Sequence, residues 1–181
     1  MSFAQNQKTE HLSFKGVPID GTLAEYVSKM KQNGVSHLKT EDGTAILSGD
    51  FAGYKACVVG VSTLIQKDLV HKIAVVFPEK ETWSMLFGNY SSLKELLTEK
   101  YGNPSEVVEK FDGAQYAQQD DYRKMFMVKA DNCKYYSIWH TEKGDIELSI
   151  GHDGVIKCFV SLAYFDKVNG GIVRKKAKDD L

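Results

Sequence analysis

The sequence lacks the features that would assign it to several large functional classes. No apolar run approaches the roughly 18–20 residues that a membrane-spanning helix needs. Charge of one sign is not in excess, because 23 basic and 24 acidic residues leave a formal net charge of −1. Nucleic-acid-binding domains are usually strongly basic, so this balance argues against DNA or RNA as a partner.

Sequence motifs of the common enzyme chemistries are absent as well. The chain contains no glycine-rich dinucleotide or phosphate loop, no G-x-S-x-G nucleophile elbow, no H-E-x-x-H zinc motif and no C-x-x-C pair. Each of these chemistries needs its own spacing of backbone groups or ligands. We therefore expect no cofactor, and we favour a non-enzymatic role over an enzymatic one.

Cysteine is scarce, and the three residues present cannot all be paired within one chain. Cys57 and Cys158 lie inside apolar strand patterns. A buried cysteine without a partner behaves as a small apolar side chain. We therefore expect these two residues to be buried free thiols rather than a disulfide.

The first residues resemble the end of a secretory signal peptide. The small residues Ser2 and Ala4 precede Gln5 with the spacing of a cleavage site, although the positive and apolar regions of a signal peptide are missing. This pattern predicts a periplasmic or secreted protein. If it is only a polar N-terminus, the protein is cytoplasmic.

Length and composition are those of one globular domain. The 181 residues are 43% hydrophobic and 26% charged, enough to bury a core without metal ions or disulfides. We expect a disordered segment or signal-peptide remnant at 1–10, a single α+β domain at 11–165 and a polar tail at 166–181. An alternative divides the domain into halves at 11–66 and 67–165.

Two helices have clear start and stop signals. Thr22 and Glu25 form a T-x-x-E capping box, and Gly34 supplies the stop. A second helix is predicted from 82 to 101, where apolar residues recur every three or four positions, and Gly102 ends it. A further capping-box pattern inside this helix leaves one bent helix and a helix–turn–helix pair as alternatives.

The rest of the pattern is typical of antiparallel strands joined by short turns. Runs of β-branched residues at 54–65 and 69–77 predict central strands. The Asp42-Gly43 pair suits a two-residue hairpin turn. We expect residues 112–132 to be an insertion that contains a loop followed by a strand.

These elements predict an α+β fold with an antiparallel-dominated sheet and the two main helices on one face. The order strand, helix and antiparallel strands occurs twice along the chain. An ordinary α+β domain and two tandem strand–helix–strands units are therefore both open.

Residues 14–21, 93–94 and 100–104 resemble segments of small exported bacterial α/β proteins of uncharacterised function. The two-unit layout also resembles the tandem-repeat fold of the β-lactamase inhibitor protein. The resembling segments are turns and helix caps. The resemblance therefore implies a fold and a binding mode, and it implies no catalytic residue.

Two predicted hairpins near the C-terminus define a candidate site. A two-residue turn at Lys143-Gly144 sets His140 opposite Glu147, and a three-residue turn occupies 152–154. With these turns, one face of the sheet points to the core and carries Trp139, Ile146, Leu148, Ile150, Ile156, Cys158, Val160, Leu162 and Tyr164.

The opposite face carries the candidate binding residues. Aromatic side chains mixed with histidine, glutamate and lysine fit protein or peptide recognition better than a deep small-molecule pocket. Cover of this face by residues 112–132 or by a neighbouring chain is the other interpretation. The candidate residues are Tyr136, Ile138, His140, Glu147, Lys157 and Phe159.

The leading hypothesis is an exported, non-enzymatic binding protein that uses this sheet face to contact a protein or peptide of unknown identity. The alternative is a small hydrolase or metal-dependent enzyme centred on His140 and Glu147, because such a pair can orient a general base or supply two metal ligands. A solvated cross-strand pair explains the same two residues without any chemistry. A structural subunit of an envelope assembly is the third hypothesis.

Overall fold

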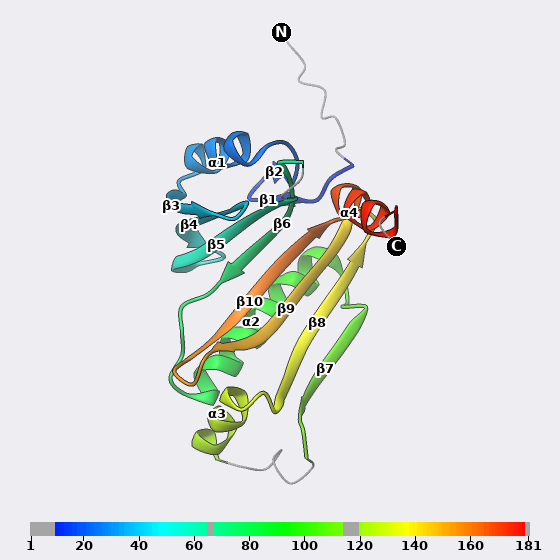
Figure 1. Ribbon diagram of the computed structural model, residues 1–181. Coiled ribbons are helices and arrows are strands. Elements are labelled where there is room, and N and C mark those ends of the chain that lie inside the picture. The colour runs from blue at the N-terminus through cyan, green and yellow to red at the C-terminus, as the bar shows by residue number, and fades with distance from the viewer. Residues whose placement is uncertain (1–9, 65–66, 114–119, 180–181) are drawn as a thin grey trace.

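Eight strands hydrogen-bond side by side in one large sheet, and every neighbouring pair is antiparallel (Figure 1). The computed structural model describes residues 10–64, 67–113 and 120–179. A separate two-stranded sheet pairs β1 (Ser13–Phe14) with β2 (Val17–Pro18). From edge to edge, the strands of the large sheet are β3 (Ser36–Glu41), β4 (Thr44–Phe51), β5 (Tyr54–Leu64), β6 (Leu69–Val76), β10 (Lys157–Asp166), β9 (Gly144–Asp153), β8 (Cys133–Thr141) and β7 (Glu106–Phe111).

Helix α1 (Leu23–Gln32) begins and ends where the sequence predicts. The Thr22 hydroxyl accepts a hydrogen bond from the Glu25 amide, and the Glu25 carboxylate accepts one from the Thr22 amide. This capping box satisfies two amides that would otherwise lack partners at the helix start. Gly34 follows the helix with a φ of 78°, a left-handed conformation that glycine adopts without steric cost.

Helix α2 (Trp83–Tyr101) is one continuous helix, which decides between the two alternatives for this segment. The Thr82 hydroxyl caps its start by accepting a hydrogen bond from the Met85 amide, and Gly102 ends it. The buried side chains recur at steps of three and four residues, as in an amphipathic helix. They are Trp83, Leu86, Tyr90, Leu93 and Leu97.

The core lies on one face of the large sheet. Val59, Val75, Leu162 and Leu148 follow one another across β5, β6, β10 and β9, and all four are buried. Cross-strand partners point to the same side of a sheet, so these residues define its core face. The buried residues of α1 and α2 join the same cluster, which confirms that both main helices pack on one face.

The order of elements occurs twice along the chain. A helix followed by four strands occurs as α1 with β3–β6 and again as α2 with β7–β10, with α3 inserted after β7. The last strands of the two sets, β6 and β10, pair with each other in the middle of the sheet. Strand β6 therefore closes the first set, whereas a division at 66/67 would assign it to the second.

The prediction of a strand within residues 112–132 is wrong, because helix α3 (Asp121–Lys129) occupies this segment. The Asp120 carboxylate accepts a hydrogen bond from the Arg123 amide at 2.9 Å and so caps the helix. Met125 and Val128 are three residues apart and pack into the core. The chain thus places its third helix beside α2 (Figure 1).

The polar tail predicted from residue 166 contains a fourth helix, α4 (Lys167–Asp179). The Asp166 carboxylate accepts a hydrogen bond from the Asn169 amide at 2.9 Å, which is the geometry of a helix N-cap. The predictions for the N-terminus rest on residues 1–9, which lie outside the described residues.

The three cysteines are free thiols, and the prediction that Cys57 and Cys158 are buried is confirmed. Cys133 is partly buried. Among the helices of the described ranges, none combines the length and the apolar character of a membrane span.

Candidate functional site

The β8–β9 and β9–β10 hairpins determine which side chains share the face away from the helices. The first turn is at Glu142-Lys143, so His140 lies opposite Asp145, and the predicted His140–Glu147 pairing is wrong. The second loop spans 154–156 instead of 152–154. Both corrections shift the pairing by an even number of residues. Because side chains alternate with a period of two, the strand residues keep their predicted faces.

Trp139 lies on the face that the sequence predicts for it, whereas Ile156 does not. Trp139 is buried on the core side, where its indole Nε1 donates to the Gly102 carbonyl at 2.9 Å. The predicted turn places Ile156 in the core, but this residue belongs to the β9–β10 loop and is 80% exposed. Of the nine predicted core residues of this region, only the one that falls in the corrected loop is displaced.

The face opposite the core, which we call the open face, carries all six candidate binding residues. Helix α3 does not cover it, because Met125, Met127 and Val128 direct that helix into the core on the other side. Helices α1 and α2 also pack on the core side, and α4 borders the end of the open face, where Gly170 and Gly171 line a hollow together with His140, Asp145 and Phe165. Tyr136, Ile138, Glu147 and Phe159 are half-buried, and His140 and Lys157 are exposed.

Small side chains form the middle of the open face. Gly60, Ala74 and Ala163 face one another across β5, β6 and β10. In the next row, the hydroxyls of Ser149 and Ser161 are 2.9 Å apart and hydrogen-bond to each other. A partner can therefore approach the backbone of the central strands closely, while larger side chains flank it on β8 and at the end of β10.

A hollow of about 540 Å³ lies at one end of the open face, between β5, β6 and β10. Val58 and Val76 are cross-strand partners in it, and Phe159 extends over Gly151 on the neighbouring strand. Apolar surface thus alternates with charged groups around this hollow. Its main lining residues are Val58, Val76, Pro78, His152, Lys157 and Phe159.

His140 lies between two carboxylates near the β7 edge of the open face. Its Nδ1 is 2.8 Å from Asp145 Oδ1, and its Nε2 is 3.3 Å from Glu106 Oε1. Carboxylates only accept hydrogen bonds, so both contacts require a protonated ring nitrogen. The hydrogen bond to Asp145, followed by that to Glu106, accordingly raises the pKa of His140. An imidazolium held in this way has no free lone pair for general-base chemistry.

His152 is held in a similar way at the other end of β9. Its Nε2 is 2.7 Å from Asp131 Oδ1, and its Nδ1 is 2.7 Å from the Gly154 carbonyl oxygen. The hydrogen bond to Asp131, followed by that to Gly154, raises the pKa of His152. This contact joins the β9–β10 loop to the residues after α3, and no local sequence pattern signals it.

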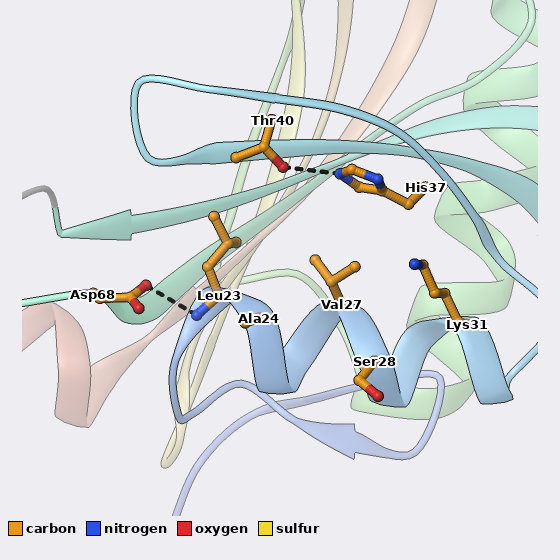
Figure 2. Close-up of a pocket in the computed structure, with 8 residues that line it drawn as sticks. All are labelled: Leu23, Ala24, Val27, Ser28, Lys31, His37, Thr40 and Asp68. Atoms are coloured by element: carbon orange, nitrogen blue, oxygen red, sulfur yellow. Dashed lines mark hydrogen bonds between the residues drawn. The ribbon is translucent and has the colours of Figure 1, made fainter.

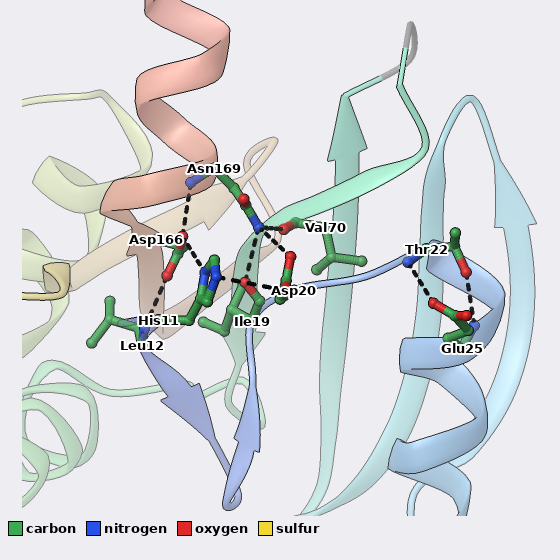
Figure 3. Close-up of polar contacts among 9 residues, drawn as sticks. All are labelled: His11, Leu12, Ile19, Asp20, Thr22, Glu25, Val70, Asp166 and Asn169. Carbon is green, nitrogen blue, oxygen red and sulfur yellow. Dashed lines mark hydrogen bonds and ion pairs between the residues drawn. The ribbon is translucent and has the colours of Figure 1, made fainter. Parts of the chain in front are cut away.

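A buried polar cluster that sequence reasoning missed joins the start of the described chain to α4 (Figure 3). The Asp166 side chain is fully buried and accepts hydrogen bonds from the Leu12 amide at 2.9 Å and from His11 Nδ1 at 3.0 Å. The Asn169 side-chain amide donates to the Val70 carbonyl on β6 at 2.8 Å. The cluster holds the segment at His11 and the start of α4 against β6 and β10 in the middle of the sheet, so we assign it a structural role.

Neither a metal-binding arrangement of side chains nor similarity to other proteins indicates a function for this chain. In the part of the chain that the structure describes, no group of three or more His, Cys, Asp or Glu side chains is arranged to hold a metal ion. No protein-family model, curated protein or solved structure matches the chain. The open face is therefore the feature of this chain that indicates a function.

Proposed function

We propose that this chain is a non-enzymatic binding protein that recognises a protein or peptide partner through the open face of its sheet. One observation carries the proposal. The open face displays Tyr136, Ile138 and Phe159, while helices α1, α2 and α3 all pack on the other side of the sheet. An antiparallel sheet with one solvated face normally alternates apolar residues inside with polar residues outside. Large apolar side chains on the solvated face are therefore best explained by a partner that covers them.

The distribution of side chains on this face supports recognition of a macromolecule. Protein interfaces combine an apolar or aromatic centre with a polar rim, and aromatic residues contribute much of their binding energy. Tyr136 and Phe159 supply the aromatic surface. The charged groups of His140, Asp145 and Lys157 stand around it, where they can select partners by charge.

The hydrolase alternative has no comparable support, because His140 lies opposite Asp145 and Glu147 lies opposite Ile138. No observation therefore favours it as a second function. Export of the protein, the predicted signal-peptide remnant and the resemblance to small exported bacterial proteins stay predictions that accompany the proposal.

Site-specific photo-cross-linking in the cells that make the protein tests the proposal. A photoreactive amino acid in place of Tyr136 should give a discrete adduct with a partner protein or peptide. The matched control is the same amino acid in place of Leu96, which is 49% exposed on α2 at the other side of the sheet. Adducts of equal yield at both positions, or none at Tyr136, would contradict the proposal.

A further inference from the structure

Strand β3 forms one edge of the large sheet and, within the described residues, pairs only with β4. All six of its residues are exposed. Half of the backbone groups of an edge strand point away from its neighbour and are free to pair with another strand. A bulge at Leu38 interrupts the register, so the regular part of this free edge is the short stretch 39–41.

A hollow of about 500 Å³ lies between this edge and α1 (Figure 2). On the helix side it is lined by Leu23, Val27 and Lys31, which are four residues apart and therefore form one row along α1. On the strand side it is lined by His37 and Thr40, whose Nε2 and Oγ1 atoms are 2.8 Å apart. In Figure 2, Leu23 and Val27 project from the helix toward β3.

The spacing of this row matches that of an extended peptide. Residues four apart on a helix are separated by about 6 Å along its axis. Alternate side chains of a strand are separated by about 6.7 Å. A strand added beside β3 would therefore place successive inward side chains near Leu23, Val27 and Lys31.

The charges around the hollow distinguish its two ends. At one end, the Asp68 carboxylate accepts a hydrogen bond from the Leu23 amide at 3.0 Å. At the other end, the Lys31 ammonium forms no ion pair with any residue in the described ranges, whereas Lys39 on β3 pairs with Glu41 at 2.6 Å. A carboxylate on a bound segment would complement Lys31.

We propose that β3 and α1 form a second docking site, which takes an extended acidic segment of a partner protein. The segment adds as a short strand to β3, places two alternate apolar side chains on Leu23 and Val27, and directs an acidic side chain to Lys31. Main-chain hydrogen bonds supply affinity in such strand addition, and the alternate side chains supply specificity. The site shares no residue with the open face.

Selection from a phage-displayed library of random heptapeptides, with the intact protein as bait, tests this site. Enriched sequences should carry apolar residues at alternate positions and an Asp or Glu two positions from one of them. A synthetic peptide of the enriched sequence is then titrated against protein variants. Lys31→Glu should weaken binding by about fivefold or more, because attraction becomes repulsion. Lys29→Glu makes the same charge change on the same helix outside the groove and should leave affinity unchanged.

A charge-swapped peptide, with lysine in place of its acidic residue, should bind Lys31→Glu better than the unaltered protein. Hydrogen exchange in the presence of the original peptide should slow at the amides of 39–41. The proposal is overturned if no sequence is enriched, if Lys31→Glu leaves binding unchanged, or if protection appears on β8–β10 instead. It is also overturned if sedimentation shows a dimer that Lys31→Glu dissociates, since the occupant is then a second copy. Protection on β8–β10 would indicate that the peptide binds at the open face, and the other results do not bear on that face.

Discussion

Replacing Trp139 with alanine should destabilise the protein far more than replacing Tyr136, although both residues lie on β8. Trp139 is 1% exposed, and removal of a large buried aromatic side chain costs about 3–5 kcal/mol. Loss of the indole hydrogen bond to the Gly102 carbonyl adds about 1 kcal/mol. Tyr136 is half-buried on the open face, so its truncation should cost about 1 kcal/mol.

Urea unfolding followed by circular dichroism measures both free energies, and equal m-values make the midpoints comparable. Phe159→Ala is a second open-face control and should resemble Tyr136→Ala. If Trp139→Ala does not fold, Trp139→Phe keeps most of the buried volume and should still cost more than Tyr136→Ala. An equal or larger loss for Tyr136→Ala would mean that β8 presents its other face to the helices. The register and the open face would then both be wrong.

Three further predictions concern the polar groups. Asp166→Asn should lower the free energy of unfolding by about 2–4 kcal/mol in a urea titration, because a buried carboxylate loses its charge and one acceptor oxygen; a loss below about 1 kcal/mol would contradict the buried cluster. In an NMR titration, the pKa of His140 should lie above the usual value of about 6.5, and Asp145→Asn should lower it. Because the folded-state pKa is raised, the contacts of His140 stabilise the fold fully below pH of about 6.5 and lose this effect as the pH rises through the raised value. A pKa of His140 at or below the usual value would refute the two-carboxylate arrangement. Burial raises the pKa of the Cys133 thiol to about 12, so iodoacetamide should label it slowly in the native protein and rapidly in guanidinium chloride. Rapid native labelling would show that this thiol is accessible.

Features of the fold that depend on residues close together in the sequence could be predicted. The capping box of α1 joins Thr22 to Glu25, and both hydrogen bonds form as expected. The face of the sheet to which each side chain of the C-terminal strands points could also be predicted, because successive side chains of a strand alternate between the two faces. Trp139 and Phe159 point to opposite sides of the sheet as predicted because the corrections to the two turns both shift the pairing by an even number of residues.

The turns were misplaced because a glycine can serve two purposes. Sequence reasoning assigns Gly144 to the β8–β9 turn, but this residue is the first of β9. A Cβ atom there would collide with the Phe165 carbonyl oxygen, so the glycine permits close approach of two strands. Only the folded structure shows whether a glycine is required for the close approach of two strands or for the backbone conformation of a turn.

Helix α3 was missed because its apolar run is short. Residues 125–128 are all apolar, and such a run fits a buried strand as well as one turn of a buried helix. Asp120 is the signal that could have decided, since it caps the helix through the Arg123 amide. By contrast, the pairing of His11 with Asp166 joins residues 155 positions apart, and no local pattern could predict it.

The open face as a binding surface is tested most directly by its own aromatic side chains. A photoreactive amino acid replaces Lys157, which lies on this face at the start of β10. The adducts of this otherwise unaltered protein are compared with those of the Tyr136→Ala/Phe159→Ala variant in the producing cells. We predict that the double substitution lowers the yield of the partner adduct by about tenfold or more while the protein stays folded. An undiminished adduct yield in the folded variant would contradict recognition through the open face.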